Sequence, residues 1–151
     1  MKRKQLNNNI KYWLAINNIP DLGPVTIKKL VDHFGSIDKV WQADHQEILQ
    51  TEGVNRKAVN SFLNNRKNVD PETELAKIAG VNVVTLDDES YPELLKHIYD
   101  PPPVLYFKGE LAKPEEKTLA IVGTRKASRY GLEFAKKLAI DLAGYGITIV
   151  S

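Results

Sequence analysis

The segment that most constrains the fold is residues 118–151, because its pattern fits a strand, a helix and a second strand in that order. An apolar run at Thr118–Val122 meets a glycine turn, and a second apolar run follows at Ile147–Val150. Between the two runs, apolar residues recur at helical spacing. Two strands joined through a helix lie parallel in one sheet. The segment therefore predicts the start of a βαβ unit of the kind that builds nucleotide-binding folds.

The turn between the predicted strand and helix has the chemistry of an anion site. Its sequence is Gly123-Thr124-Arg125, and Lys126 and Arg129 follow in the loop. A helix N-terminus offers free N–H groups and a partial positive charge, and an arginine can bind phosphate through two parallel hydrogen bonds. A strand–helix turn with a merely solvated arginine fits the same residues.

Two familiar nucleotide motifs are absent at this turn. No G-x-G-x-x-G follows the strand, and no G-K-S or G-K-T ends the turn. These absences argue against an NAD-dependent dehydrogenase and against an ATPase of the P-loop class.

The first 67 residues predict short helices joined by turns. Pro24 begins one helix that Gly35 ends, and Asp44 with Glu47 forms the pattern of a capping box. A last helix is expected at residues 54–69. We expect this helical domain to span residues 1–69.

Residues 70–151 are expected to form the second domain, which starts with mixed elements. Asp70-Pro71-Glu72 predicts a helix that ends at Gly80. A strand, a short helix and another strand are expected at Val81–Leu86, Glu93–Tyr99 and Val104–Phe107. The acidic run Asp87–Glu89 between them is expected to be a solvated loop.

Two turns in the helical domain resemble the hairpins of helix-hairpin-helix modules, which point backbone N–H groups at phosphate. The first is Leu22-Gly23-Pro24, with Lys28 and Lys29 one turn downstream, and residues 51–57 are a weaker second copy. Gly23, Lys28 and Lys29 are therefore candidates for a secondary contact with DNA. Plain helix–helix connections in a small bundle are the alternative.

Composition excludes several classes of site. The 151 residues contain no cysteine, which excludes disulfides and thiolate chemistry, and the three histidines are far apart. We expect no metal, no cofactor and no catalytic residue, and we expect Tyr12, Trp13 and Trp41 to pack in the core. No apolar run approaches a membrane span, and the N-terminus lacks the apolar region of a signal peptide, so a cytoplasmic location is expected.

Charge adds a modest indication of anionic partners. The net charge is only +2. Residues 1–70 and 118–151 nevertheless hold more cationic than acidic side chains, whereas residues 71–117 hold the reverse.

Three stretches together resemble the DprA/Smf family of bacterial DNA-processing proteins. They are the helical N-terminus with Leu22-Gly23-Pro24, the sequence YPELLKHIYDPPPVLYFKG at residues 91–109, and residues 120–151. The resemblance covers nearly the whole chain but only the N-terminal part of a family member. It implies an α+β fold in which a sterile-alpha-motif-like, helix-hairpin-helix-like domain precedes the truncated start of a Rossmann-like domain.

The resemblance also implies a function, a set of partners and a site. Family members bind and protect single-stranded DNA and help to load the RecA recombinase in natural transformation and recombination. They form homodimers, and they are not known as enzymes. The implied DNA-binding residues are Gly123, Thr124 and Arg125, followed by Lys126, Ser128 and Arg129.

Two alternatives to this function remain open. One is an enzyme that uses the glycine turn to hold a nucleotide or phosphoribosyl substrate, and the other is a helical domain that only contacts other proteins. We also expect residues 118–151 to be poorly packed or to associate with another chain, because two parallel strands alone do not make a stable sheet. Impaired activity is the corresponding expectation for a chain that stops at Ser151.

Overall fold

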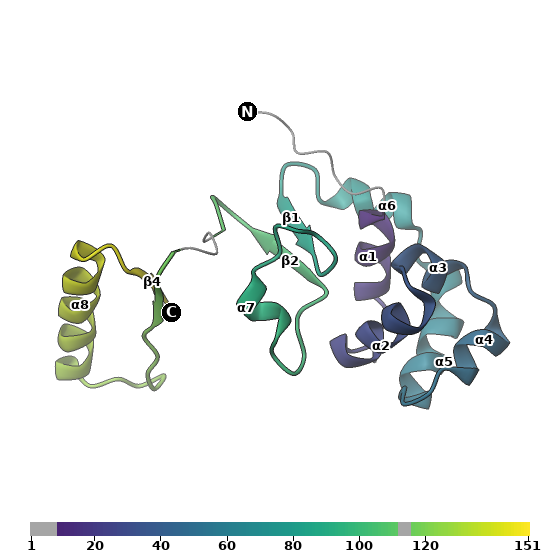
Figure 1. Cartoon of the computed structure of the whole chain (residues 1–151), viewed down its shortest axis with the longest axis horizontal. Coiled ribbons are helices and arrows are strands. Elements are labelled where there is room, and N and C mark those ends of the chain that lie inside the picture. The colour runs from purple at the N-terminus through teal and green to yellow at the C-terminus, as the bar shows by residue number, and fades with distance from the viewer. Residues whose placement is uncertain (1–8, 112–115) are drawn as a thin grey trace. The chain divides into compact units, whose positions relative to one another are not determined.

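The structure, a computed structural model, describes residues 9–111 and 116–151. Its internal contacts divide the chain into two units between Glu110 and Leu111 (Figure 1). The elements of the N-terminal unit are α1 (Ile10–Asn17), α2 (Pro24–Phe34), α3 (Ile37–Gln42), α4 (His45–Gln50), α5 (Arg56–Asn65), the 3₁₀-helix η1 (Arg66–Asn68), α6 (Pro71–Lys77), β1 (Asn82–Thr85), α7 (Glu93–Lys96) and β2 (Val104–Phe107). Those of the C-terminal unit are β3 (Thr118–Ala120), α8 (Arg129–Gly144) and β4 (Thr148–Val150). The predicted α+β fold is confirmed.

The core of the N-terminal unit lies among its first five helices. The fully buried side chains there come from all five helices and include Trp13, Leu30, Val40, Ile48 and Phe62. Trp41 packs against this cluster, and its ring centroid lies 5.8 Å from that of Phe62. Tyr12 also packs against it. The prediction that Tyr12, Trp13 and Trp41 pack in the core is confirmed.

The small sheet of this unit and α6 both pack on α1. Strands β1 and β2 pair antiparallel, with Thr85 opposite Val104, and Val104 joins the helical core. Glu74 on α6 is buried, where it accepts a hydrogen bond from Asn18 Nδ2 at 2.6 Å and pairs with Lys77 at 2.5 Å. A buried carboxylate needs such partners, because desolvation without them is costly.

These contacts cross the boundary between the two predicted domains, residues 1–69 and 70–151. Within this chain, residues 70–110 pack on the helices, since α6 contacts α1 and β2 contacts α1. The assignment of residues 70–110 to the same domain as residues 118–151 stays a prediction.

Local end signals account for most element boundaries. The Asp44–Glu47 capping box is present in both directions, and Gly35 ends α2 with a φ of 84°. Asp70 caps α6 through the N–H of Thr73. Ser36 precedes α3 in extended conformation, but its side chain makes no capping hydrogen bond. The predicted helix at residues 54–69 is shorter, because its last turn tightens into η1.

The C-terminal unit is the predicted βαβ unit. Strands β3 and β4 pair parallel, with Leu119 opposite Ile149, and α8 connects them. Gly131 and the apolar residues Ala135, Leu138, Ala139 and Leu142 of α8 are half-buried, as one face of a helix that lies on a sheet should be. No side chain of residues 116–151 is fully buried. The predicted weak packing is therefore present in this unit by itself.

Tyr91 gives the N-terminal unit a pH-dependent contact. Its ring is buried, its hydroxyl donates to the carbonyl oxygen of Pro102 at 2.8 Å, and burial raises the pKa of the phenol. The protonated phenol is therefore favoured in the fold. This stability is complete below the unfolded pKa, at about pH 10, and is lost as the pH rises through the folded pKa.

We expect Tyr91→Phe to cost about 1 kcal/mol at neutral pH through the lost hydrogen bond. The variant should also lose less stability than the wild type between about pH 9 and pH 11. Urea melts of both proteins across that range measure the difference. Parallel pH profiles of the two would contradict the role given to this hydroxyl.

Candidate nucleic-acid interface

The glycine turn forms the loop between β3 and the start of α8. After Ala120, the N–H of Ile121 still bonds the carbonyl of Val150, and the chain then leaves the sheet. Ser128 caps α8, because its hydroxyl accepts a hydrogen bond from the N–H of Gly131 at 3.1 Å. Ser128 was predicted as a phosphate contact, and the structure gives its oxygen a capping role.

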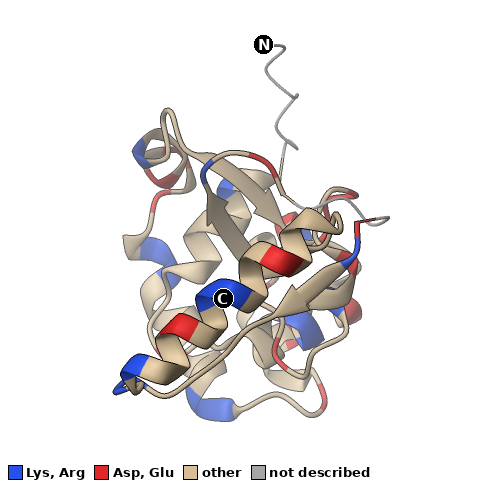
Figure 2. Cartoon of the chain, turned by 90° about the vertical axis from the view of Figure 1, so that its left-hand side faces the viewer, with Lys and Arg blue, Asp and Glu red and all other residues tan. Residues whose placement is uncertain are grey.

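The loop leaves its polar groups available. None of the N–H groups of residues 122–128 donates a hydrogen bond within the part of the chain that the structure describes. Arg125 and Lys126 are exposed, and neither forms an ion pair with any residue of 9–111 or 116–151. Figure 2 shows cationic and acidic positions in alternation along α8, and Arg125, Lys126 and Arg129 all precede the first acidic residue of the helix, Glu133.

Arg129 differs from the other two cations of the loop. Its side chain is 93% exposed and pairs with Glu133, one turn later on α8, at 3.2 Å. An exposed pair at this spacing is worth only a few tenths of a kcal/mol, so a phosphate could replace the glutamate at little cost.

Gly123 has room around it that the fold does not use. A Cβ built at this position would meet no atom of the described structure within 4 Å. Its φ is not in the left-handed region either. Neither the turn nor a neighbour requires glycine here, so the open space beside its backbone is available to a ligand.

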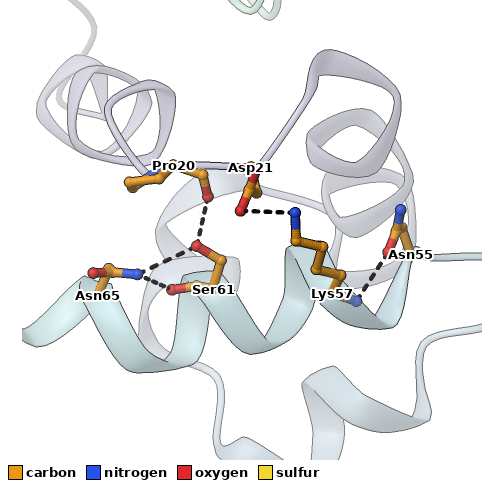
Figure 3. A network of polar contacts seen from close by, with 6 residues as sticks. All are labelled: Pro20, Asp21, Asn55, Lys57, Ser61 and Asn65. Atoms are coloured by element: carbon orange, nitrogen blue, oxygen red, sulfur yellow. Dashed lines mark hydrogen bonds and ion pairs between the residues drawn. The ribbon is translucent and has the colours of Figure 1, made fainter.

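The two predicted hairpin turns of the N-terminal unit lie against each other through α5 (Figure 3). Lys57 Nζ pairs with the carboxylate of Asp21 at 3.3 Å, and Ser61 Oγ donates to the carbonyl of Pro20 at 2.5 Å. Asn55 caps α5 by accepting from the N–H of Lys57. Asp21 has a φ of 61°, a conformation that few residues other than glycine adopt.

Within this arrangement, the three candidates for a secondary DNA contact, Gly23, Lys28 and Lys29, have different surroundings. Lys29 donates to the carbonyl of Gly53 in the second turn, so its charge already has a partner inside the unit. Lys28 and Gly23 are exposed. A phosphate contact of Gly23 and Lys28 stays a prediction, and Lys29 connects the two hairpins.

The glycine turn lies in the C-terminal unit, and both hairpins lie in the N-terminal unit. The acidic run at residues 87–89 differs from its prediction as a solvated loop, because two of its carboxylates bind Thr85. The hydroxyl of Thr85 donates a hydrogen bond to Asp87 Oδ1 at 2.6 Å, and the N–H of Thr85 donates one to Asp88 Oδ2 at 2.7 Å. The two aspartates stabilise the end of β1 and are not simply solvated. Consecutive aspartates two and three residues after a strand-end threonine are the signal that could have indicated this.

Two structural features are absent among residues 9–111 and 116–151. No group of three or more histidine, aspartate or glutamate side chains there could hold a metal ion. Within the same residues, no helix is both long and apolar enough to cross a membrane.

Two family models match parts of this chain. Residues 82–151 match the family model for DNA recombination-mediator protein A, and residues 14–61 match a SAM-like helix-hairpin-helix tandem. Protein Smf of Synechocystis sp. is 34% identical over 96% of this chain. The chain belongs to the DprA/Smf family. The range of the tandem match includes both predicted hairpins, Leu22-Gly23-Pro24 and residues 51–57.

Other DprA/Smf relatives match over different shares of the chain. Protein Smf of Escherichia coli is 30% identical over 92% of it, and DNA processing protein DprA of Bacillus subtilis is 37% identical over 48%. In the other direction, the chain covers 38%, 36% and 25% of the Synechocystis, Escherichia coli and Bacillus relatives. What those longer proteins do as a whole therefore comes to this chain only as a proposal.

Proposed function

We propose that this chain contributes a binding site for single-stranded DNA, in a protein that processes DNA during transformation and recombination. The site is the loop from Gly123 to Arg129. Arg125 binds a phosphate through its planar guanidinium group, and Lys126 and Arg129 add positive charge beside it.

The observation that carries the proposal is the unused polar surface of this loop. Its backbone N–H groups, Arg125 and Lys126 have no partner in the described structure, and the space beside Gly123 is open. An anion at the start of α8 would satisfy these groups together. The match of residues 82–151 to the recombination-mediator model supports DNA as the source of that anion.

The proposed site is small, so its affinity should be low and should depend on salt. Binding to a single strand weakens with a slope of about −0.7 in log K against log salt for each phosphate contact. Arg125 and Arg129 can provide two such contacts. The slope for this chain should therefore be near −1.4.

The proposal assigns the chain a non-enzymatic role. Assistance to RecA and association with a second copy of the chain are part of the same proposal, on the strength of the family membership. The enzyme alternative needs the same loop to hold a nucleotide substrate. Hydrolysis of nucleoside monophosphates by the purified chain would favour that alternative.

We expect Arg125→Ala to weaken binding of a fluorescent single-stranded oligonucleotide and to reduce the salt slope by about 0.7. Fluorescence anisotropy at several salt concentrations measures both quantities. Lys136→Ala is the matched control, because it removes one exposed positive charge from α8 without touching the loop.

The control separates a local contact from the effect of net charge. Lys136→Ala should leave the salt slope close to that of the wild type. Equal losses in the two variants would mean that only the total charge matters. Binding that ignores both salt and the Arg125 substitution would reject the phosphate contact.

A further inference from the structure

Two aromatic side chains are exposed at the start of α8, next to the proposed phosphate site. Tyr130 and Phe134 are 75% and 56% exposed. Their rings are nearly parallel, with centroids 6.1 Å apart and an angle of 21° between the planes. Together the two rings form an exposed apolar patch beside the cationic residues of the loop, and apolar patches with a polar rim mark binding surfaces.

Tyr130 and Phe134 do not belong to the face of α8 that packs on the sheet. The face of α8 with the half-buried residues is formed by Gly131, Ala135, Leu138, Ala139 and Leu142. At 100° per residue, Tyr130 and Phe134 lie together on a flank of the helix, outside the centre of that face. The sheet β3–β4 therefore leaves both rings accessible.

We propose that Tyr130 and Phe134 form a stacking platform for an unpaired base of the nucleic acid whose phosphate the neighbouring loop binds. This inference rests on the proposed function, because the same strand must supply the base and the phosphate. It adds two binding residues that the glycine–arginine turn does not include.

The charges around the rings favour a nucleic acid over an apolar protein partner. Tyr130 directly follows Arg129, whose side chain is 93% exposed, and Arg125 and Lys126 lie in the loop before it. An apolar partner would have to desolvate these cations without pairing them. A single strand presents phosphates and aromatic bases in alternation, which matches cations beside stacked rings.

The platform also gives a reason for a preference for single strands. Bases of a duplex are already stacked and paired, so a side chain can reach their faces only after they are unstacked. Every base has an aromatic face, so the platform should accept any sequence.

Oligonucleotides with and without bases test this inference on the full chain. Anisotropy compares a single strand with an abasic strand of the same length and backbone charge. We expect the wild type to bind the strand with bases about 5- to 150-fold more tightly for each stacked base. Tyr130→Leu should remove most of that preference and leave the salt slope unchanged, since leucine keeps the apolar character but not the aromatic face.

Tyr145→Leu is the matched control for the tyrosine variant. Tyr145 is 85% exposed at the other end of α8, away from the loop, so the base preference should remain. Circular dichroism of each variant should show the helix content of the wild type.

The outcomes separate the two proposals. Equal affinity of the wild type for both strands, with the salt slope still dependent on Arg125, overturns the platform and keeps the phosphate site. An unchanged base preference in Tyr130→Leu also overturns the platform. Absence of salt-dependent binding to either strand overturns the proposed function and the platform with it.

Discussion

Phe62→Ala is expected to destabilise the N-terminal unit by about 3–5 kcal/mol. The ring is fully buried where α5 meets the other helices, and it packs edge-to-face on Trp41. The guanidinium carbon of Arg66 lies 5.5 Å from the ring centroid, and this arginine donates hydrogen bonds to the carbonyls of Trp41 and Ala43. Removal of the ring leaves a cavity and also loosens that contact between η1 and α3.

Urea denaturation followed by tryptophan fluorescence measures this loss. Both tryptophans of the chain, Trp13 and Trp41, lie in the N-terminal unit and report on its unfolding alone. Phe134→Ala is the control, because that ring is 56% exposed and belongs to the C-terminal unit. A midpoint for Phe62→Ala that matches the wild type would contradict the assignment of Phe62 to the core.

Hydrogen exchange is expected to differ by orders of magnitude between the two units. Amides of α1, α2 and α5 surround a closed core and should be among the last to exchange. The C-terminal unit offers one helix of 16 residues on a two-stranded sheet with no fully buried side chain. Isolated helices of this length and isolated strand pairs are marginally stable in water, so amides of α8 should exchange rapidly.

Exchange followed by mass spectrometry of peptides assigns the rates to each element. The comparison should be made on the free chain at low concentration, where association is minimal. Slow exchange throughout α8 under these conditions would contradict the weak packing of the unit. Protection that appears only as the concentration rises would show that another copy of the chain covers its apolar surface.

The element boundaries could be predicted where the signals are local. Asp44 and Glu47 lie within one turn of the helix that they cap, and Gly35 ends its helix through its own backbone conformation. The βαβ unit was predictable for a related reason, because two β-branched runs and an amphipathic stretch occur in one continuous segment. Ser36 shows the limit of such signals, since the residue type favours a cap that its side chain does not make.

Contacts between distant segments could not be predicted from patterns. Lys57 and Asp21 meet only because the helices bring two turns together, and Lys29 reaches Gly53 for the same reason. The sequence pattern therefore indicates Lys29 only as a cation one turn downstream of the first hairpin. At the glycine turn, the cationic residues are neighbours in the sequence and their DNA contact stays a prediction, whereas the stacking of Tyr130 on Phe134 required the helix geometry.

The central claim, that the loop from Gly123 to Arg129 is the main contact with single-stranded DNA, can be tested by NMR mapping of amide signals. An unlabelled oligonucleotide is added to the ¹⁵N-labelled chain, and shifts are followed for both units. We expect the largest shifts at Gly123, Thr124 and Arg125, with smaller ones at Gly23 and Lys28. Shifts confined to the hairpin turns of the N-terminal unit would contradict it.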